Sequence, residues 1–210
     1  MGRRLISVIA LIVSVALAFG TISAFSWVPS TLLAPFLDYQ HIERADDGFA
    51  LGIPPDWEYV VAADAHPDEW WDHDKVDDTE EFHEDFVDTG GLLMARRASP
   101  LGALESCFVF DESSLAAKPP RWTKLKDAKR DVVIAYEDDP EVIDLETTYM
   151  DLPAGRVLCV DRMDTDGWDD RSYYFKEGRS WFSLQCGTHV APEDRWLSIA
   201  ETFEFLPDEA

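Results

Sequence analysis

Four short stretches near the C-terminal end decide the expected fold: LETTYMDL (145–152), RVLCVDRM (156–163), RSYYFK (171–176) and SWFSLQC (180–186). Apolar and polar residues alternate along each stretch, which is typical of β-strands that bury one face. The turn signals Pro153-Ala154-Gly155, Asp166-Gly167 and Glu177-Gly178 separate them. Connections this short favour antiparallel hairpins over helical crossovers. The sequence therefore predicts an antiparallel meander.

An amphipathic helix is expected to follow the meander. Pro192 lies near its first turn, and Trp196, Ile199, Ala200 and Phe203 would share one side. That apolar side would place the helix against the sheet.

The N-terminal half of the domain reads as further strands and two helices. A strand over 49–53 ends at Pro54-Pro55, and residues 58–63 are its expected hairpin partner. The remaining expected elements are an acidic helix over 66–88 that ends at Gly90-Gly91, strands over 92–98 and 103–111, and a basic amphipathic helix over 121–132.

The first 28 residues are expected to direct the chain to a membrane. Arg3 and Arg4 precede a run without any charged residue from Leu5 to Val28, longer than the roughly 20 residues that span a bilayer. Small residues within the run also resemble a signal-peptide cleavage site. The sequence thus predicts either a retained single-pass anchor or a cleaved signal peptide, with residues 29–44 as a connector and a globular domain over 45–210 outside the cytoplasm.

The charge balance is strongly acidic, with 42 Asp and Glu against 18 Lys and Arg and a formal net charge of −24. A hydrophobic content of 46% is enough for a real core, so the acids are expected on the surface of one folded domain. Nucleic acids and anionic membrane faces are not expected partners, because phosphate groups attract clusters of Lys and Arg.

The three cysteines allow one disulfide and leave one thiol in an oxidising compartment. Cys107, Cys159 and Cys186 each lie in an apolar run, so a structural role is expected and all three pairings stay open. A nucleophilic pair of Cys186 with the nearby His189 is a weaker hypothesis.

The acidic stretch over 66–88 is the first candidate for a ligand site. His73, Asp77, His83 and Glu84 could hold a divalent metal ion, because carboxylates and imidazoles bind Zn²⁺, Mn²⁺ or Ca²⁺. Their spacing matches no known metal motif, and a solvated helix face is the alternative interpretation. No other cofactor is expected.

Trp70 and Trp71 lie beside these acids and could form an aromatic interface for a partner, although they could equally fill the core.

A second acidic group surrounds Gly167 and contains Asp161, Asp164, Asp166, Asp169 and Asp170. It is interpreted as an exposed turn without a ligand, because Asp-Gly between alternating strands is a strong hairpin signal. Motifs of nucleophilic hydrolases, phosphate-binding loops and dinucleotide-binding sites do not occur in the sequence.

Three segments resemble the PsbP-like superfamily: GFALGIPPDW (48–57), LPAGR (152–156) and WLSIAETFEFLP (196–207). The resemblance covers most of residues 45–207. It implies an α/β/α sandwich around a mostly antiparallel sheet, here preceded by one N-terminal hydrophobic helix. It also implies protein interaction without catalysis, and it offers no catalytic motif that could be transferred to this chain.

The sequence therefore predicts an exported, membrane-tethered domain that binds a protein or an envelope component and is not an enzyme. The alternative is an extracytoplasmic metal-binding protein that uses residues 66–88, and an uncharacterised hydrolase is a third, weaker hypothesis.

Overall fold

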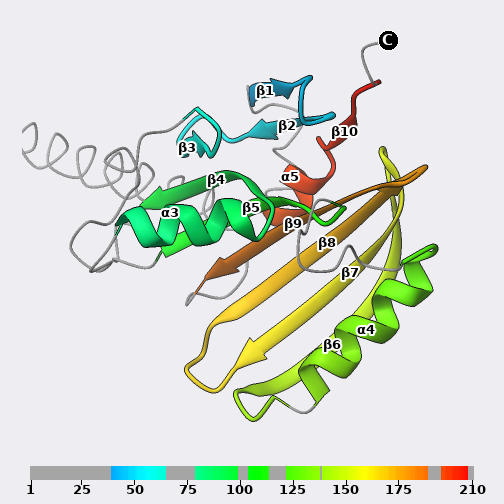
Figure 1. The fold of residues 1–210 in the computed structure, drawn as a ribbon. Helices are drawn as coiled ribbons and strands as arrows, with labels where there is room; N and C mark the ends of the chain where they lie inside the picture. Colours follow the sequence, from blue (N-terminus) through cyan, green and yellow to red (C-terminus); the bar gives the residue numbers. More distant parts are fainter. Residues whose placement is uncertain are drawn as a thin grey trace, which may run out of the picture.

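The computed structural model of the chain describes residues 39–64, 79–98, 104–113, 122–137, 139–188 and 195–207. These residues form a seven-stranded and a three-stranded sheet, and all of their strand pairs are antiparallel (Figure 1). The larger sheet has the order β3 (Glu58–Val61), β4 (Gly91–Ala98), β5 (Leu104–Asp111), β9 (Ser180–Thr188), β8 (Asp169–Glu177), β7 (Gly155–Asp164) and β6 (Val142–Leu152). The smaller sheet has the order β1 (Gln40–Arg44), β2 (Phe49–Ile53) and β10 (Glu204–Phe205).

The predicted meander is confirmed as β6 to β9. Leu152 lies opposite Gly155 and Glu177 lies opposite Ser180, so two of its three hairpins close through two-residue turns. Gly178 occupies the second of these turns with a φ of 58°, which L-amino acids with a side chain rarely adopt. The turn signals of the sequence therefore mark real chain reversals.

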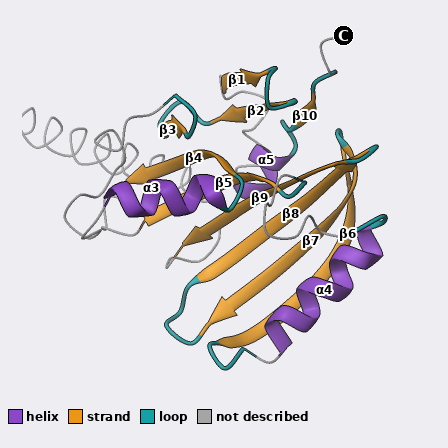
Figure 2. Ribbon diagram, viewed as in Figure 1, coloured by secondary structure: helices purple, strands orange, loops and turns teal. Residues whose placement is uncertain are grey.

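Helices cover one face of the larger sheet, and the smaller sheet with one short helix covers the other (Figure 2). The first face carries α3 (Thr79–Asp88) and α4 (Leu125–Glu137). The opposite face carries α5 (Arg195–Ala200) together with β1, β2 and β10. The molecule is thus a mixed α/β fold with antiparallel sheets, and a small sheet replaces part of the helical layer that the expected sandwich would place there.

The main core joins the two short motifs that lie farthest apart in the sequence. Phe203 stacks on Phe175 with ring centroids 4.1 Å apart, and it lies 5.9 Å from Phe49. The Gly52 amide donates a hydrogen bond of 2.8 Å to the Thr202 hydroxyl. A Cβ atom at Gly52 would come within 3.0 Å of that side chain, so glycine allows the close approach.

The disulfide joins Cys107 to Cys186 and leaves Cys159 as a buried free thiol. The two bridged cysteines lie opposite each other on β5 and β9, with Cα atoms 4.0 Å apart. Because the sequence separation is 79 residues, the bridge ties the C-terminal meander to the N-terminal half of the sheet.

The predicted hairpin between 49–53 and 58–63 is wrong. β3 pairs with β4, and the antiparallel neighbours of β2 are β1 and β10. The turn after Pro54, closed by a 3.0 Å bond from the Trp57 amide to the Pro54 carbonyl, directs the chain from the smaller sheet to the larger one. β1 also begins at Gln40, inside the range expected to be a connector.

Several predictions from the N-terminal half fall outside the described residues. They include the membrane-directing segment over 1–28 and the first part of the helix expected over 66–88, of which α3 represents the last part. Within the described ranges, no helix combines the length and the apolar character that a bilayer crossing requires.

Candidate functional site

The arginines in most of the molecule are neutralised by neighbouring carboxylates. Away from α4 and the two hairpin turns beside it, every described arginine forms an ion pair: Arg44 with Asp47, Arg96 with Glu58, Arg97 with Asp56, Arg162 with Asp164, Arg171 with Asp161, and Arg195 with Asp56. This is the expected arrangement in a protein with such an excess of acids.

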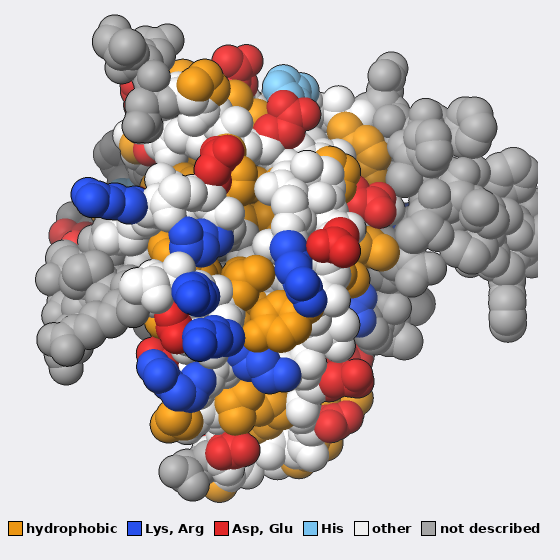
Figure 3. Space-filling view, turned by 90° about the vertical axis from the view of Figure 1, so that its right-hand side faces the viewer, with side chains coloured by type: hydrophobic (Ala, Val, Ile, Leu, Met, Phe, Trp, Pro, Cys, Tyr) orange, Lys and Arg blue, Asp and Glu red, His pale blue; other side chains and the backbone are white. Residues whose placement is uncertain are grey.

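One surface departs from this arrangement, and we call it the basic face. Figure 3 shows its Lys and Arg side chains gathered around apolar side chains on the side of the molecule that carries α4. Its cations are Lys124, Lys126, Lys129, Arg130, Arg156, Lys176 and Arg179. Among the described residues, only Arg130 of these forms an ion pair, with its neighbour Asp131 at 2.8 Å. The positive charges of this face are therefore largely uncompensated.

The cations of α4 lie at the wrong end of the helix for stability. A helix N-terminus carries a partial positive charge and favours acids, whereas Lys126, Lys129 and Arg130 lie in the N-terminal half and the last turn contains no basic residue. Lys126 is also three and four positions from Lys129 and Arg130, which places like charges side by side. Helix stability thus does not explain the charge pattern.

The two acids within this part of α4 are engaged in structural roles. The Asp127 carboxylate accepts hydrogen bonds from the Thr123 hydroxyl at 2.8 Å and from the backbone amides of Thr123 and Lys124. These bonds cap the helix and lower the pKa of Asp127. Asp131 accepts a 3.0 Å bond from the Trp122 indole N–H as well as its contact with Arg130. Asp127 lies close enough to Lys126 to interact with its charge, but neither carboxylate forms an ion pair with a described lysine.

Aromatic rings lie directly beneath several of the cations. Lys129 and Arg156 approach the same Tyr149 ring, at 5.6 Å and 5.3 Å from its centroid. Lys176 lies 5.6 Å from the centroid of the Trp181 ring. Cation–π contacts hold such side chains in place without cancelling their charge, so the face combines aromatic surface with available positive charge.

A pocket of about 280 Å³ opens within this face, and we call it the tryptophan pocket. Trp122 and Trp181 form its aromatic walls, with ring centroids 5.3 Å apart at 67°. Lys176 and Arg179 from the β8–β9 turn and the side of Thr123 complete the rim. The pocket therefore lies between the N-terminal end of α4 and the β8–β9 turn, which are about fifty residues apart in the sequence.

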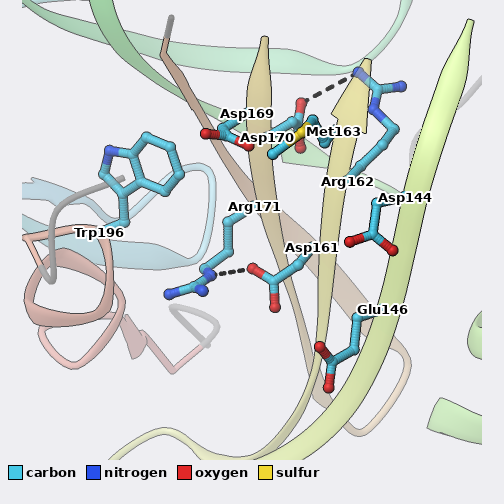
Figure 4. Close-up of a pocket in the computed structure, with 9 residues that line it drawn as sticks. All are labelled: Asp144, Glu146, Asp161, Arg162, Met163, Asp169, Asp170, Arg171 and Trp196. Atoms are coloured by element: carbon cyan, nitrogen blue, oxygen red, sulfur yellow. Dashed lines mark hydrogen bonds and ion pairs between the residues drawn. The ribbon is translucent and has the colours of Figure 1, made fainter. Parts of the chain in front are cut away.

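A second pocket of about 230 Å³ lies at the opposite face, near α5, and we call it the carboxylate pocket (Figure 4). Arg171 donates a hydrogen bond to Asp161 at its centre, and Trp196 borders it. Burial lowers the pKa of the Arg171 guanidinium, but its interactions with Asp161 and Tyr173 together outweigh burial, and the pKa is raised. Arg171 and Asp161 therefore form an ion pair within the pocket.

The acids around Gly167 have a different role from the one expected. Gly167 does form a turn with a φ of 82°, but Asp161 and Asp170 lie on β7 and β8 and accept bonds from Arg171 and Arg162. Burial raises the pKa of Asp170 despite the opposing effect of Arg162. The expectation of plain exposed acids is wrong for these two residues.

Most residues of the predicted metal and interaction sites lie outside the described ranges. These are His73, Asp77, Trp70 and Trp71. His83 lies on α3 with its Nε2 atom 3.2 Å from the Ala62 carbonyl oxygen, and Glu84 is exposed beside it. Across the described residues, no three potential metal ligands converge on one point. The metal site stays a prediction.

The cysteines carry no reactive thiol in the described residues. Cys186 is bonded to Cys107, so the hypothesis of a Cys186–His189 nucleophile is wrong for the oxidised protein, and His189 lies outside the described ranges. Burial raises the pKa of the Cys159 thiol to about 12, which keeps it protonated at neutral pH.

Sequence reasoning identified the basic helix but missed the site. The cations of α4 lie close together in the sequence, and their position in the N-terminal half of the helix was the signal that could have indicated a binding surface. Arg156, Lys176 and Arg179 join them only through the order of the strands.

No protein-family model matches the chain, and no curated protein matches it. Among solved structures, the chain is similar to the solution structure of cyanobacterial PsbP (CyanoP) from Synechocystis sp. PCC 6803. The TM-score is 0.42 and the sequence identity 16%, over 79% of this chain and 91% of that chain. That structure belongs to the same PsbP group that the short motifs resemble. A likeness of this size adds nothing to the functional assignment, which rests on the chain's own residues.

Proposed function

We propose that this chain is a non-catalytic binding domain whose basic face docks an acidic segment of a partner protein. The proposal includes export of the domain and its tethering to the membrane, which are supported by the N-terminal run from Leu5 to Val28. The observation that carries it is the set of unpaired cations on one surface of a protein with a net charge of −24.

The unpaired cations of the basic face favour the binding of anionic groups from another molecule. The fold pairs its other described arginines internally, yet within the described ranges Lys126, Lys129 and Lys176 form no ion pair with a carboxylate. A single exposed ion pair contributes only about 0–1 kcal/mol, so affinity requires several pairs formed together. A face with grouped cations meets that requirement and also accelerates the encounter with an acidic partner.

The size of the face favours a short acidic segment over an extended polyanion. α4 has 13 residues and is therefore about 20 Å long. Exposed acids such as Glu137, Glu141 and Asp151 border it. An anionic membrane or a nucleic acid would extend over these acids and be repelled, whereas a segment of a few residues would not.

The direct test uses the full-length chain and a short polyglutamate peptide. Lys126→Gln with Arg130→Gln is expected to weaken binding about five- to thirtyfold, from two exposed pairs of about 0.5–1 kcal/mol each. Thr148→Glu with Thr165→Glu lies elsewhere on the surface and changes the net charge by the same amount, so it is the matched control. Isothermal titration calorimetry at two salt concentrations measures both.

Equal losses in the two double variants would contradict the proposal, because the peptide would then respond only to net charge. The same two double variants can also be used as baits to capture binding proteins from native membranes. A partner that is lost with the α4 variant and kept with the control would be the physiological ligand of the face.

A further inference from the structure

The tryptophan pocket offers a small site with two chemically different halves. Trp122 and Trp181, whose rings meet at 67°, supply an aromatic wall, while Lys176 and Arg179 supply positive charge at the rim. Its volume of about 280 Å³ lies just below the usual range of ligand pockets, which begins at about 300 Å³. It therefore fits one group the size of a single side chain.

The aromatic wall is held in place without a ligand. Trp181 is only 3% exposed, and its backbone amide donates a 2.8 Å bond to the Ser113 hydroxyl. The Trp122 indole is fixed by its bond to Asp131 and by an edge contact of 5.8 Å with Tyr174. A preorganised wall lowers the entropy that binding must overcome.

The positive rim is also positioned by the fold. Gly178 turns the chain at a φ of 58°, which places Arg179 at the tip of the β8–β9 hairpin. The Lys176 ammonium donates to the Gly178 carbonyl and lies over the Trp181 ring. Neither cation forms an ion pair with a carboxylate among the described residues, so both are available to an incoming anion.

We propose that the tryptophan pocket binds a carboxylate that is carried on an aromatic ring. The ring lies against Trp122 and Trp181, and the carboxylate meets Lys176 and Arg179. A bare inorganic anion would leave the aromatic wall uncovered, and a neutral ring would leave the cations without a counterion. Only a ligand with both an aromatic ring and a carboxylate contacts the aromatic wall and also pairs with the cations.

Two sources supply this chemistry: an aromatic residue at the free C-terminus of a partner, and a small aromatic acid in solution. The peptide source rests on the proposed function, because the pocket opens within the basic face that would dock the partner. The pocket would then be the anchor of that interface, and the surrounding lysines would hold the acidic residues that precede it.

The test compares 3-phenylpropionate with its uncharged amide and with propionate, which lacks the ring. The full-length chain is titrated while the indole N–H signal of Trp122 is followed by NMR. The acid is expected to bind with a Kd of a few millimolar, the amide at least about tenfold more weakly, and propionate without detectable saturation. Equal binding of acid and amide, or no binding of the acid, would overturn the proposal.

A matched pair of variants locates the site. Lys176→Gln with Arg179→Gln is expected to reduce binding of the acid to that of the amide. Lys129→Gln with Arg156→Gln removes the same charge from the same face but lies over Tyr149, and it should keep the preference. The exposed turn variant Arg179→Gln alone serves if the first double variant does not fold. Loss of the preference in the Tyr149 variant as well would contradict the assignment to this pocket.

Peptides ending in phenylalanine, with a free or an amidated C-terminus, separate the two sources. Tighter binding of the free peptide supports the anchor at a partner's C-terminus, while binding of 3-phenylpropionate alone supports the small acid. Polyglutamate provides the independent readout. If polyglutamate binds and 3-phenylpropionate does not, the pocket proposal fails and the proposed function stands. If 3-phenylpropionate binds and polyglutamate does not, the pocket proposal stands and the docking of an acidic segment is ruled out.

Discussion

Each of the two pockets is lined by two cations, but the surroundings of those cations differ. In the carboxylate pocket, Arg171 is matched with Asp161, and Arg162 with Asp164 and Asp170. In the tryptophan pocket, Lys176 and Arg179 meet no carboxylate within the described residues. The arginines of the first pocket are therefore paired within the fold, whereas the cations of the second pocket remain open to an external anion. The pairing of its cations, and not the mere presence of a hollow, distinguishes the tryptophan pocket as a site for an anion.

The largest expected effect concerns the disulfide between β5 and β9 in the middle of the larger sheet. β9 connects the two halves of the larger sheet, and replacing both bridged cysteines in Cys107→Ser with Cys186→Ser removes a closed loop of 79 residues. The free energy of unfolding should fall by about 4 kcal/mol in the chain-entropy account. Denaturant unfolding without reductant measures it.

Reduction of the wild-type protein should reproduce this loss, and the double variant should then be insensitive to reductant. If the double variant were as stable as the oxidised wild-type protein, the expected stabilisation by the disulfide would be contradicted. The Cys159 thiol, with its pKa of about 12, should react with a thiol reagent at neutral pH only after unfolding.

The next effect separates the two pockets directly. Arg171→Met leaves the half-buried Asp161 carboxylate unpaired and should lower the free energy of unfolding by about 2 kcal/mol. Arg179→Gln removes an exposed cation without a described partner and should change it by less than about 0.5 kcal/mol. Urea denaturation of both variants measures the contrast. Equal destabilisation would mean that the two pockets do not differ as described.

A smaller effect has the opposite sign. Lys126→Glu places an acid near the positive end of α4 and removes two like-charge contacts, so stability should rise by about 0.5–1 kcal/mol. The same change should weaken binding of polyglutamate. Thermal unfolding and calorimetry on one sample show whether stability and binding oppose each other.

Lys126→Gln is the control, because it removes the like charges without adding an acid, and it should give an intermediate stability. If Lys126→Glu were less stable than the wild type, the cations of α4 would have a structural role, and the argument for function from their placement would fail.

The smallest effect is a difference in pH response. The pKa of Asp127 lies below its ordinary value of 3.8, so the stability from its helix cap is present above about pH 4 and is lost as the pH falls through its folded pKa. The pKa of Asp170 lies above 3.8, so burial of its charge opposes folding above that pKa, and this penalty is relieved as the pH falls. NMR titration of the two carboxyl carbons should show Asp127 below 3.8 and Asp170 above it.

The regular elements could be predicted because their signals are local. The strands of the meander follow from alternation between turn residues, and α4 follows from Ala128 and Val132 on one side of a basic helix. The resemblance of three short motifs also indicated the layered fold. The pairing of β2 was misjudged, because the turn after Pro54 suggests a hairpin, whereas the smaller sheet closes through β1 and β10.

The candidate site was predicted only in part. The basic stretch from Lys124 to Arg130 was visible as a helix, yet the residues that turn it into a pocket belong to the β8–β9 hairpin. The acids around Gly167 looked equivalent in the sequence. Their register with Arg171 and Arg162, which distinguishes them from exposed turn residues, exists only in the sheet.

By itself, the sequence determined the secondary structure of the meander and of the amphipathic helix α4, because each depends on residues within a few positions of one another. Only the tertiary structure decided which cysteines pair, which arginines form ion pairs and which of the described lysines do not. The reason is that ion pairing depends on strand order and register, and these follow from burying the apolar faces of segments that lie far apart in the chain.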